Sequence, residues 1–282
     1  MTRRRSRRGR PQPAAAAAFA CLSSTESTVT RMDPSLWLPN RDARPGVRLR
    51  LLCFAHAGAG ATPFLRWGAA LPDGVAVCPV RRPGREGAFA EPPLRDTRAL
   101  VDATLRALDT LPPCPTALLG HSFGGLLAYE VARAMQAAGA APELLIVSAT
   151  PAPQLPRALP RLADLPDDRF VREVDARYGG IPNDVKAAPD LLALLLPALR
   201  ADMAAYEAHR HTPGPPLRCP ILADRGRDDR TVDPTSLSRW RELTTGRFEA
   251  REFPGGHFFP FDRASGFLAT LRTRLAPAAT HI

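Results

Sequence analysis

A short glycine-rich segment contains the residue best suited to nucleophilic chemistry. Residues 120–125 read Gly-His-Ser-Phe-Gly-Gly, so Ser122 stands at the centre of a Gly-x-Ser-x-Gly motif. An apolar stretch that predicts a buried strand precedes the motif, and a stretch that predicts a helix follows it. Such a context holds the serine on a sharp turn, with its hydroxyl exposed and the helix N-terminus directed at developing negative charge. A glycine-rich packing or phosphate-binding turn is the alternative interpretation.

A serine hydroxyl is a poor nucleophile at neutral pH and needs a general base. Of the six histidines, His257 has the most suitable position, within Phe-Pro-Gly-Gly-His-Phe-Phe at residues 253–259. This loop follows the last predicted strand and precedes the last predicted helix, so it can present an imidazole to Ser122. Its glycine pair permits an unusual backbone path. A structural loop histidine is the alternative.

The base in turn needs a carboxylate that holds its tautomer and stabilises the imidazolium. Residues 226–232 read Gly-Arg-Asp-Asp-Arg-Thr-Val and follow a predicted strand. The Gly-x-x-Asp-x-x-Val spacing selects Asp229, with Val232 packing inward to anchor the loop, and Asp228 remains the alternative. The order of nucleophile, acid and base along the chain is Ser122, Asp229, His257, which is typical of α/β-hydrolases.

Acyl transfer also requires hydrogen-bond donors for the oxyanion of the tetrahedral intermediate. One donor is expected from the residue after the nucleophile, the backbone N–H of Phe123. The second is expected from the loop after an early strand, where the turn His56-Ala57-Gly58 provides the N–H of Ala57. We expect His56 itself to shape this loop rather than to titrate during catalysis.

Strands and helices alternate around these residues. Because they do so on both sides of a long insert, the sequence predicts an α/β fold with an open, mainly parallel sheet and helices on both faces. Apolar runs predict strands at 47–54, 75–80, 117–120, 143–148, 220–224 and 248–253. Helices are predicted at 63–71, 126–137 and from the N-cap Asp96 to about residue 111.

Residues 151–215 interrupt the alternation. A proline-rich stretch is followed by three predicted helices, at 167–178, 183–187 and 190–208, and Pro197 is expected to kink or split the last one. A helical block between two strands of one sheet predicts a lid over the carboxyl edge, where ligands bind. A helical decoration without a gating role is the alternative. The core is then expected to comprise residues 32–150 and 216–282.

Composition limits the remaining possibilities. The 282 residues carry a net charge of +10, but residues 1–31 contribute +6 of it, so the rest is only mildly basic and does not indicate nucleic-acid binding. We expect residues 1–31 to be a disordered basic extension, with globular sequence and a possible start at Met32; a secretory signal and a polyanion-binding arm are the alternatives. No apolar run approaches a membrane span. The five cysteines form no Cys-x-x-Cys pair, which argues against a zinc ribbon or disulfide framework.

Taken together, these motifs resemble the type II thioesterases, the free-standing editing thioesterases of polyketide and non-ribosomal peptide assembly lines. The resemblance covers about residues 33–275. Two departures occur in the first turn, where Ala55 replaces the family's usual proline and Ala59 its second glycine; neither removes a backbone N–H. The resemblance rests on residues 54–58 (Phe-Ala-His-Ala-Gly), 82–86 (Arg-Pro-Gly-Arg-Glu), 120–125, 226–232 and 253–259, and within the insert on 165–168 and 194–202.

This resemblance implies a serine thioesterase of the α/β-hydrolase fold. Its substrates are expected to be aberrant or stalled acyl groups on the phosphopantetheine arm of acyl or peptidyl carrier proteins, with Ser122, His257 and Asp229 as catalytic triad. No metal or cofactor is implied, because the phosphopantetheine belongs to the substrate. We expect a cytoplasmic monomer that binds neither nucleic acid nor membrane.

Several other functions use the same residues. A carboxylesterase or an acyltransferase would share the triad, and a thioesterase domain cut from a larger synthase is conceivable, although Met32 offers the chain its own start. A non-enzymatic binding protein would normally have lost a triad member. The arginine-rich loop 81–85 suggests electrostatic docking of acidic carrier proteins, with ordinary solvated arginines as the alternative.

Overall fold

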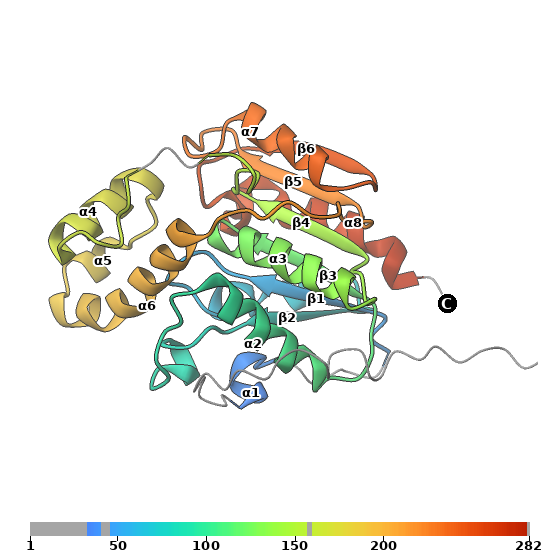
Figure 1. The fold of residues 1–282 in the computed structure, drawn as a ribbon, viewed down its shortest axis with the longest axis horizontal. Helices are drawn as coiled ribbons and strands as arrows, with labels where there is room; N and C mark the ends of the chain where they lie inside the picture. Colours follow the sequence, from blue (N-terminus) through green and yellow to red (C-terminus); the bar gives the residue numbers. More distant parts are fainter. Residues whose placement is uncertain (1–32, 41–45, 157–159, 281–282) are drawn as a thin grey trace, which may run out of the picture.

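The computed structural model describes residues 33–40, 46–156 and 160–280. Its centre is one parallel sheet with the strand order β2-β1-β3-β4-β5-β6 (Figure 1). Every neighbouring pair of these strands is parallel, so all their carboxyl ends meet at one edge. The strands are β1 (Leu49–Phe54), β2 (Val75–Val80), β3 (Thr116–His121), β4 (Leu144–Ser148), β5 (Ile221–Gly226) and β6 (Phe248–Phe253).

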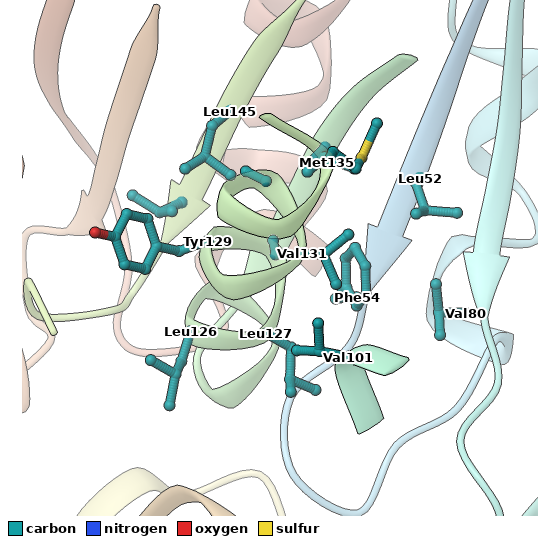
Figure 2. Close-up of a cluster of buried hydrophobic side chains, with 14 of the residues drawn as sticks. Leu52, Phe54, Val80, Val101, Leu126, Leu127, Tyr129, Val131, Met135 and Leu145 are labelled. Carbon is teal, nitrogen blue, oxygen red and sulfur yellow. The ribbon is translucent and has the colours of Figure 1, made fainter. Parts of the chain in front are cut away.

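Alternating apolar side chains give the sheet two buried faces. In β1, Leu52 and Phe54 pack on the face covered by α2 and α3, whereas Leu51 and Cys53 pack on the face covered by α8. Figure 2 shows part of the first of these clusters, with side chains contributed by α3 and by neighbouring strands. Burial on both faces explains why the central strands are continuously apolar.

Helices cover both faces of the sheet, and three further helices form the segment between β4 and β5. The predicted N-cap is confirmed, because the Asp96 carboxylate accepts the N–H of Ala99 at 2.8 Å. The helices are α1 (Pro34–Trp37), α2 (Thr97–Asp109), α3 (Phe123–Ala137), α4 (Asp167–Tyr178), α5 (Asn183–Lys186), α6 (Pro189–Ala208), α7 (Pro234–Ser238) and α8 (Phe267–Thr280).

One local prediction is wrong, and one of two alternatives in another is excluded. Residues 63–71 form two short 3₁₀ turns, Thr62–Phe64 and Trp67–Ala69, instead of one helix. The segment packs Phe64 and Trp67 into the core, and Gly68 inside the second turn lowers the helix propensity of the segment. Pro197 does not split α6, which continues unbroken from Pro189 to Ala208 because the residues around it are strong helix formers.

Helices α4, α5 and α6 form the insert between β4 and β5 and lie to one side of the sheet (Figure 1). They enclose an apolar cluster of their own, which contains Phe170, Val174, Leu196 and Met203. The proposed extension at 1–31 lies outside the described residues. Among the helices that the structure describes, none is long and apolar enough to cross a membrane.

Candidate active site

Ser122 occupies the sharp turn between β3 and α3. Its backbone has φ +55° and ψ −123°, a conformation that L-residues adopt only under strain. Two hydrogen bonds hold it: its N–H donates to the Ser148 carbonyl at 2.8 Å, and its carbonyl accepts the Thr150 hydroxyl at 2.8 Å. The turn therefore rests against the end of β4, and the serine hydroxyl is fixed beyond the edge of the sheet.

Gly124→Ala is expected to lower the free energy of unfolding by about 3 kcal/mol, because a side chain cannot fit in this turn. A Cβ at Gly124 would lie 2.1 Å from the Phe54 carbonyl oxygen, which belongs to the backbone of β1 and cannot move aside easily. Urea unfolding measures the effect. Gly68→Ala is the control, since no atom lies within 4 Å of a Cβ there. Equal stabilities of the two variants would contradict this explanation of the motif.

The structure brings the three residues of the predicted triad into one hydrogen-bonded chain. The Nε2 atom of His257 lies 3.0 Å from Ser122 Oγ, and its Nδ1 atom lies 2.9 Å from Asp229 Oδ2. Both His257 and Asp229 are buried. Asp228, the alternative acid, is exposed and makes no such contact, and Val232 is fully buried as expected for a loop anchor.

The loops that carry Asp229 and His257 are packed directly on each other. The N–H of Arg227 donates to Phe253 O at 2.8 Å, and the N–H of Asp228 donates to Gly255 O at 3.0 Å. A Cβ at Gly226 would lie 2.2 Å from Gly256 O, so only glycine permits this approach. The acid and the base are therefore held in register by their backbones.

Thr231 also belongs to this hydrogen-bonded chain of side chains, and the sequence analysis did not predict its role. Its hydroxyl donates to Asp229 Oδ1 at 2.7 Å and lies 3.1 Å from His257 Nδ1, and its N–H donates to the same carboxylate oxygen at 2.8 Å. Burial opposes ionisation of Asp229, but the hydrogen bonds from His257 and Thr231 outweigh it and hold the pKa of this carboxyl below its ordinary value. Asp229 is consequently ionised at neutral pH.

Two other histidines lie close to the triad in an apolar setting. Burial and the nearby charge of Arg82 lower the pKa of His56 to about 3, so this imidazole is neutral at physiological pH. Burial also lowers the pKa of His121 well below its ordinary value, and its Nδ1 atom lies 3.1 Å from the Ser148 hydroxyl. His56 thus does not titrate near neutrality, as its predicted role in shaping the loop requires.

The two predicted oxyanion donors lie beside the serine. Phe123 is the first residue of α3, and helices leave their first N–H groups without intrahelical partners. Ala57 lies in the loop after β1, which lines the same cavity as Ser122 and His257. Within the described residues, neither N–H donates to a protein acceptor, as an oxyanion donor requires.

An apolar cavity of about 320 Å³ leads to these groups. The insert provides most of its wall, and the serine, the base and both proposed donors line its floor. Such a chamber suits a hydrocarbon chain whose carbonyl lies at the serine. The apolar side chains that the insert contributes are Val174, Tyr178, Ile181, Pro182, Val185, Leu192, Leu195, Leu196, Leu199, Met203 and Tyr206.

The docking hypothesis for the loop 81–85 is wrong for two of its arginines. Arg82 and Arg85 are neither solvated nor free to meet a partner, because both are buried and paired with Asp202 of α6. Burial of arginine is costly unless a carboxylate compensates it. The sequence carried no signal for this pairing, since Asp202 is separated from the loop by more than a hundred residues.

Residues 49–275 match the family model described as Thioesterase domain. The chain therefore belongs to the thioesterase domain family and is a thioester hydrolase. The parallel sheet with helices on both faces agrees with the α/β-hydrolase fold that the sequence predicted.

Similar proteins include named thioesterases and a protein named for gramicidin S biosynthesis. Gramicidin S biosynthesis protein GrsT of Aneurinibacillus migulanus is 36% identical over 227 residues, which cover 80% of this chain and 88% of that protein. Thioesterase PikA5 of Streptomyces venezuelae is 36% identical over 235 residues, covering 82% and 83%. The solved structure of BorB, the type II thioesterase of the borrelidin cluster, is 36% identical and superposes with a TM-score of 0.75, covering 86% of this chain and 97% of that one.

Proposed function

We propose that this protein is a type II editing thioesterase that removes aberrant or stalled acyl groups from carrier proteins of a polyketide or non-ribosomal peptide synthase. The observation that carries the proposal is the hydrogen-bonded chain Ser122–His257–Asp229 at the floor of an apolar cavity. Relatives named for gramicidin S and borrelidin biosynthesis support the choice of substrate over that of a general esterase.

In the proposed mechanism, Ser122 Oγ attacks the thioester carbonyl while His257 Nε2 accepts its proton. The negative oxygen of the tetrahedral intermediate accepts hydrogen bonds from the N–H groups of Ala57 and Phe123. His257 then protonates the departing sulfur, and the phosphopantetheine thiol leaves. Water repeats the sequence on the acyl-serine and releases the carboxylic acid. The proton transfers need no cofactor, because His257 performs all of them.

The insert takes the role of a lid in this proposal. Helices α4 to α6 wall the cavity, and Leu195 of α6 both lines it and is partly exposed, so an incoming acyl chain or phosphopantetheine arm would cover this side chain. The substrate protein stays outside while its arm enters. We propose further that the enzyme acts as a cytoplasmic monomer whose partners are carrier protein domains.

Hydrolysis of one short acyl group on three carriers tests this function: an acyl carrier protein, free pantetheine and p-nitrophenol. We expect kcat/KM to be at least about tenfold higher for the carrier thioester than for the oxygen ester, because binding of the remote carrier lowers the barrier. Product analysis should detect free acid. Faster turnover of the oxygen ester would indicate a general esterase, and acyl transfer to an amine or alcohol would indicate an acyltransferase. Equal rates on carrier and pantetheine would remove the carrier protein as a partner.

A further inference from the structure

A fully buried carboxylate in the insert is paired with two arginines of the sheet body. Asp202 lies in α6 and has no exposed surface. Its Oδ2 atom lies 2.9 Å from Arg82 Nη2 and 2.5 Å from Arg85 Nη1, and its Oδ1 atom lies 3.0 Å from Arg85 Nη2. We call these three side chains the Asp202 cluster. Burial opposes ionisation, but the two arginines hold the pKa of Asp202 below its ordinary value.

The cluster is bonded to the loop that carries Ala57. The Asp202 carboxylate accepts the N–H of Gly58 at 2.8 Å. Arg82 donates to the carbonyls of Ala55, His56 and Ala59, at 3.1, 2.8 and 3.0 Å. The peptide groups on both sides of Ala57 are therefore clamped, and the direction of its N–H is set by contacts from α6 and from the loop after β2.

The same cluster also contacts the side chain of Phe123, the residue whose backbone N–H is the other proposed donor. The guanidinium of Arg82 lies over the Phe123 ring, 5.4 Å from its centroid. One carboxylate and two guanidinium groups leave one net positive charge behind the oxyanion hole, in a buried region where charge is weakly screened. This charge favours an oxyanion in front of it.

We propose that Asp202 is a positioning residue for catalysis, which orients the Ala57 N–H through Gly58, Arg82 and Arg85 and makes helix α6 a part of the oxyanion hole. The inference rests on the proposed function of Ser122 and of the two backbone donors. A purely structural cluster would instead fasten α6 to the body without affecting the transition state. A positioning role would affect the binding only of ligands that place an oxygen in the oxyanion hole, whereas a purely structural role would affect all ligands alike.

Asp202→Asn separates these roles. We expect kcat for a short acyl-carrier thioester to fall about 10- to 100-fold while KM changes less than about threefold, because a misplaced donor loses part of the 10²–10³-fold effect of a complete one. An alkyl boronic acid, whose tetrahedral adduct with Ser122 places an oxygen in the hole, should bind more weakly by a similar factor. An acyl-pantetheine analogue with a thioether in place of the thioester has no such oxygen and should bind unchanged.

Asp167→Asn is the matched control. Asp167 is also a carboxylate of the insert that is paired with an arginine, Arg200, but it is exposed and touches neither the loop of Ala57 nor the cavity. Its kcat and both affinities should equal those of the wild type. An irreversibly misfolded fraction that binds nothing leaves the measured dissociation constants unchanged, so it does not distort the comparison of the two ligands.

A charge-balanced double variant, Asp202→Asn/Arg85→Gln, guards against misfolding. It keeps one net positive charge in the cluster but breaks the bridge from α6, so it should fold better and show the same selective loss. Unchanged kcat in a folded variant, equal weakening of boronate and thioether, or loss of the fold in both variants would each overturn the proposal. If the wild type neither hydrolyses thioesters nor binds the boronate, the proposed function fails first.

Discussion

Ser122→Ala is expected to lower kcat for acyl-carrier thioesters by at least about 10⁴-fold. Without the hydroxyl no acyl-enzyme can form, and only the oxyanion donors and substrate binding remain, which give a small residual acceleration. Binding should survive, because the apolar walls of the cavity are unaltered. Free thiol released from the carrier, measured over hours with excess enzyme, gives the residual rate.

Stability provides the control for Ser122→Ala. Alanine has the same β-carbon as serine, so the strained backbone at φ +55° persists and the melting temperature should change little. Ser238→Ala removes an exposed hydroxyl at the end of α7, and its activity should equal that of the wild type. Turnover by Ser122→Ala above a few per cent of wild type would show that another group is the nucleophile.

Asp229→Asn is expected to lower kcat by about 10⁴-fold with a much smaller effect on KM. The carboxylate holds a proton on His257 Nδ1, so that Nε2 is free to accept the proton of Ser122. An amide can instead donate to Nδ1 and favour the unproductive tautomer. Steady-state kinetics on the carrier thioester measures the change.

Asp228→Asn is the control at the neighbouring position. The Asp228 carboxylate is exposed, and among the described residues it is Asp229 that pairs with His257 Nδ1. Its kcat should stay within about twofold of the wild type, as for other surface substitutions. A large loss in Asp228→Asn with little in Asp229→Asn would reverse the assignment that the Gly-x-x-Asp-x-x-Val spacing made.

Acid unfolding gives Asp229 a second readout. The pKa of this carboxyl is lower in the folded protein than in the unfolded chain, so its ionised form stabilises the fold at neutral pH. That contribution is present above the unfolded pKa of about 3.9 and is lost as the pH falls through the folded value. Asp229→Asn should therefore flatten the decline of the unfolding free energy below about pH 5.

Local sequence patterns predicted the structure correctly where the conformation of a segment depends mainly on its own residues. The apolar runs predicted every strand of the sheet, and the helix ranges of the insert agree closely with α4, α5 and α6. The prediction of one helix at residues 63–71 failed because the conformation of this segment depends on how Phe64 and Trp67 pack, and no local pattern contains that information. The prediction that Arg82 and Arg85 dock a partner protein failed for a related reason. Arginine is usually exposed, and here a carboxylate that is distant in the sequence makes its burial possible.

The sequence by itself determined the order of elements and the choice of Ser122, Asp229 and His257 as candidates, because glycine spacing, loop position and chain order constrain those residues locally. Only the tertiary structure decided what surrounds them. Thr231 beside His257 and Asp202 behind Ala57 are contacts between segments that meet through the packing of the sheet, its loops and the insert. Their partners depend on three-dimensional closeness, on which spacing along the chain gives no information.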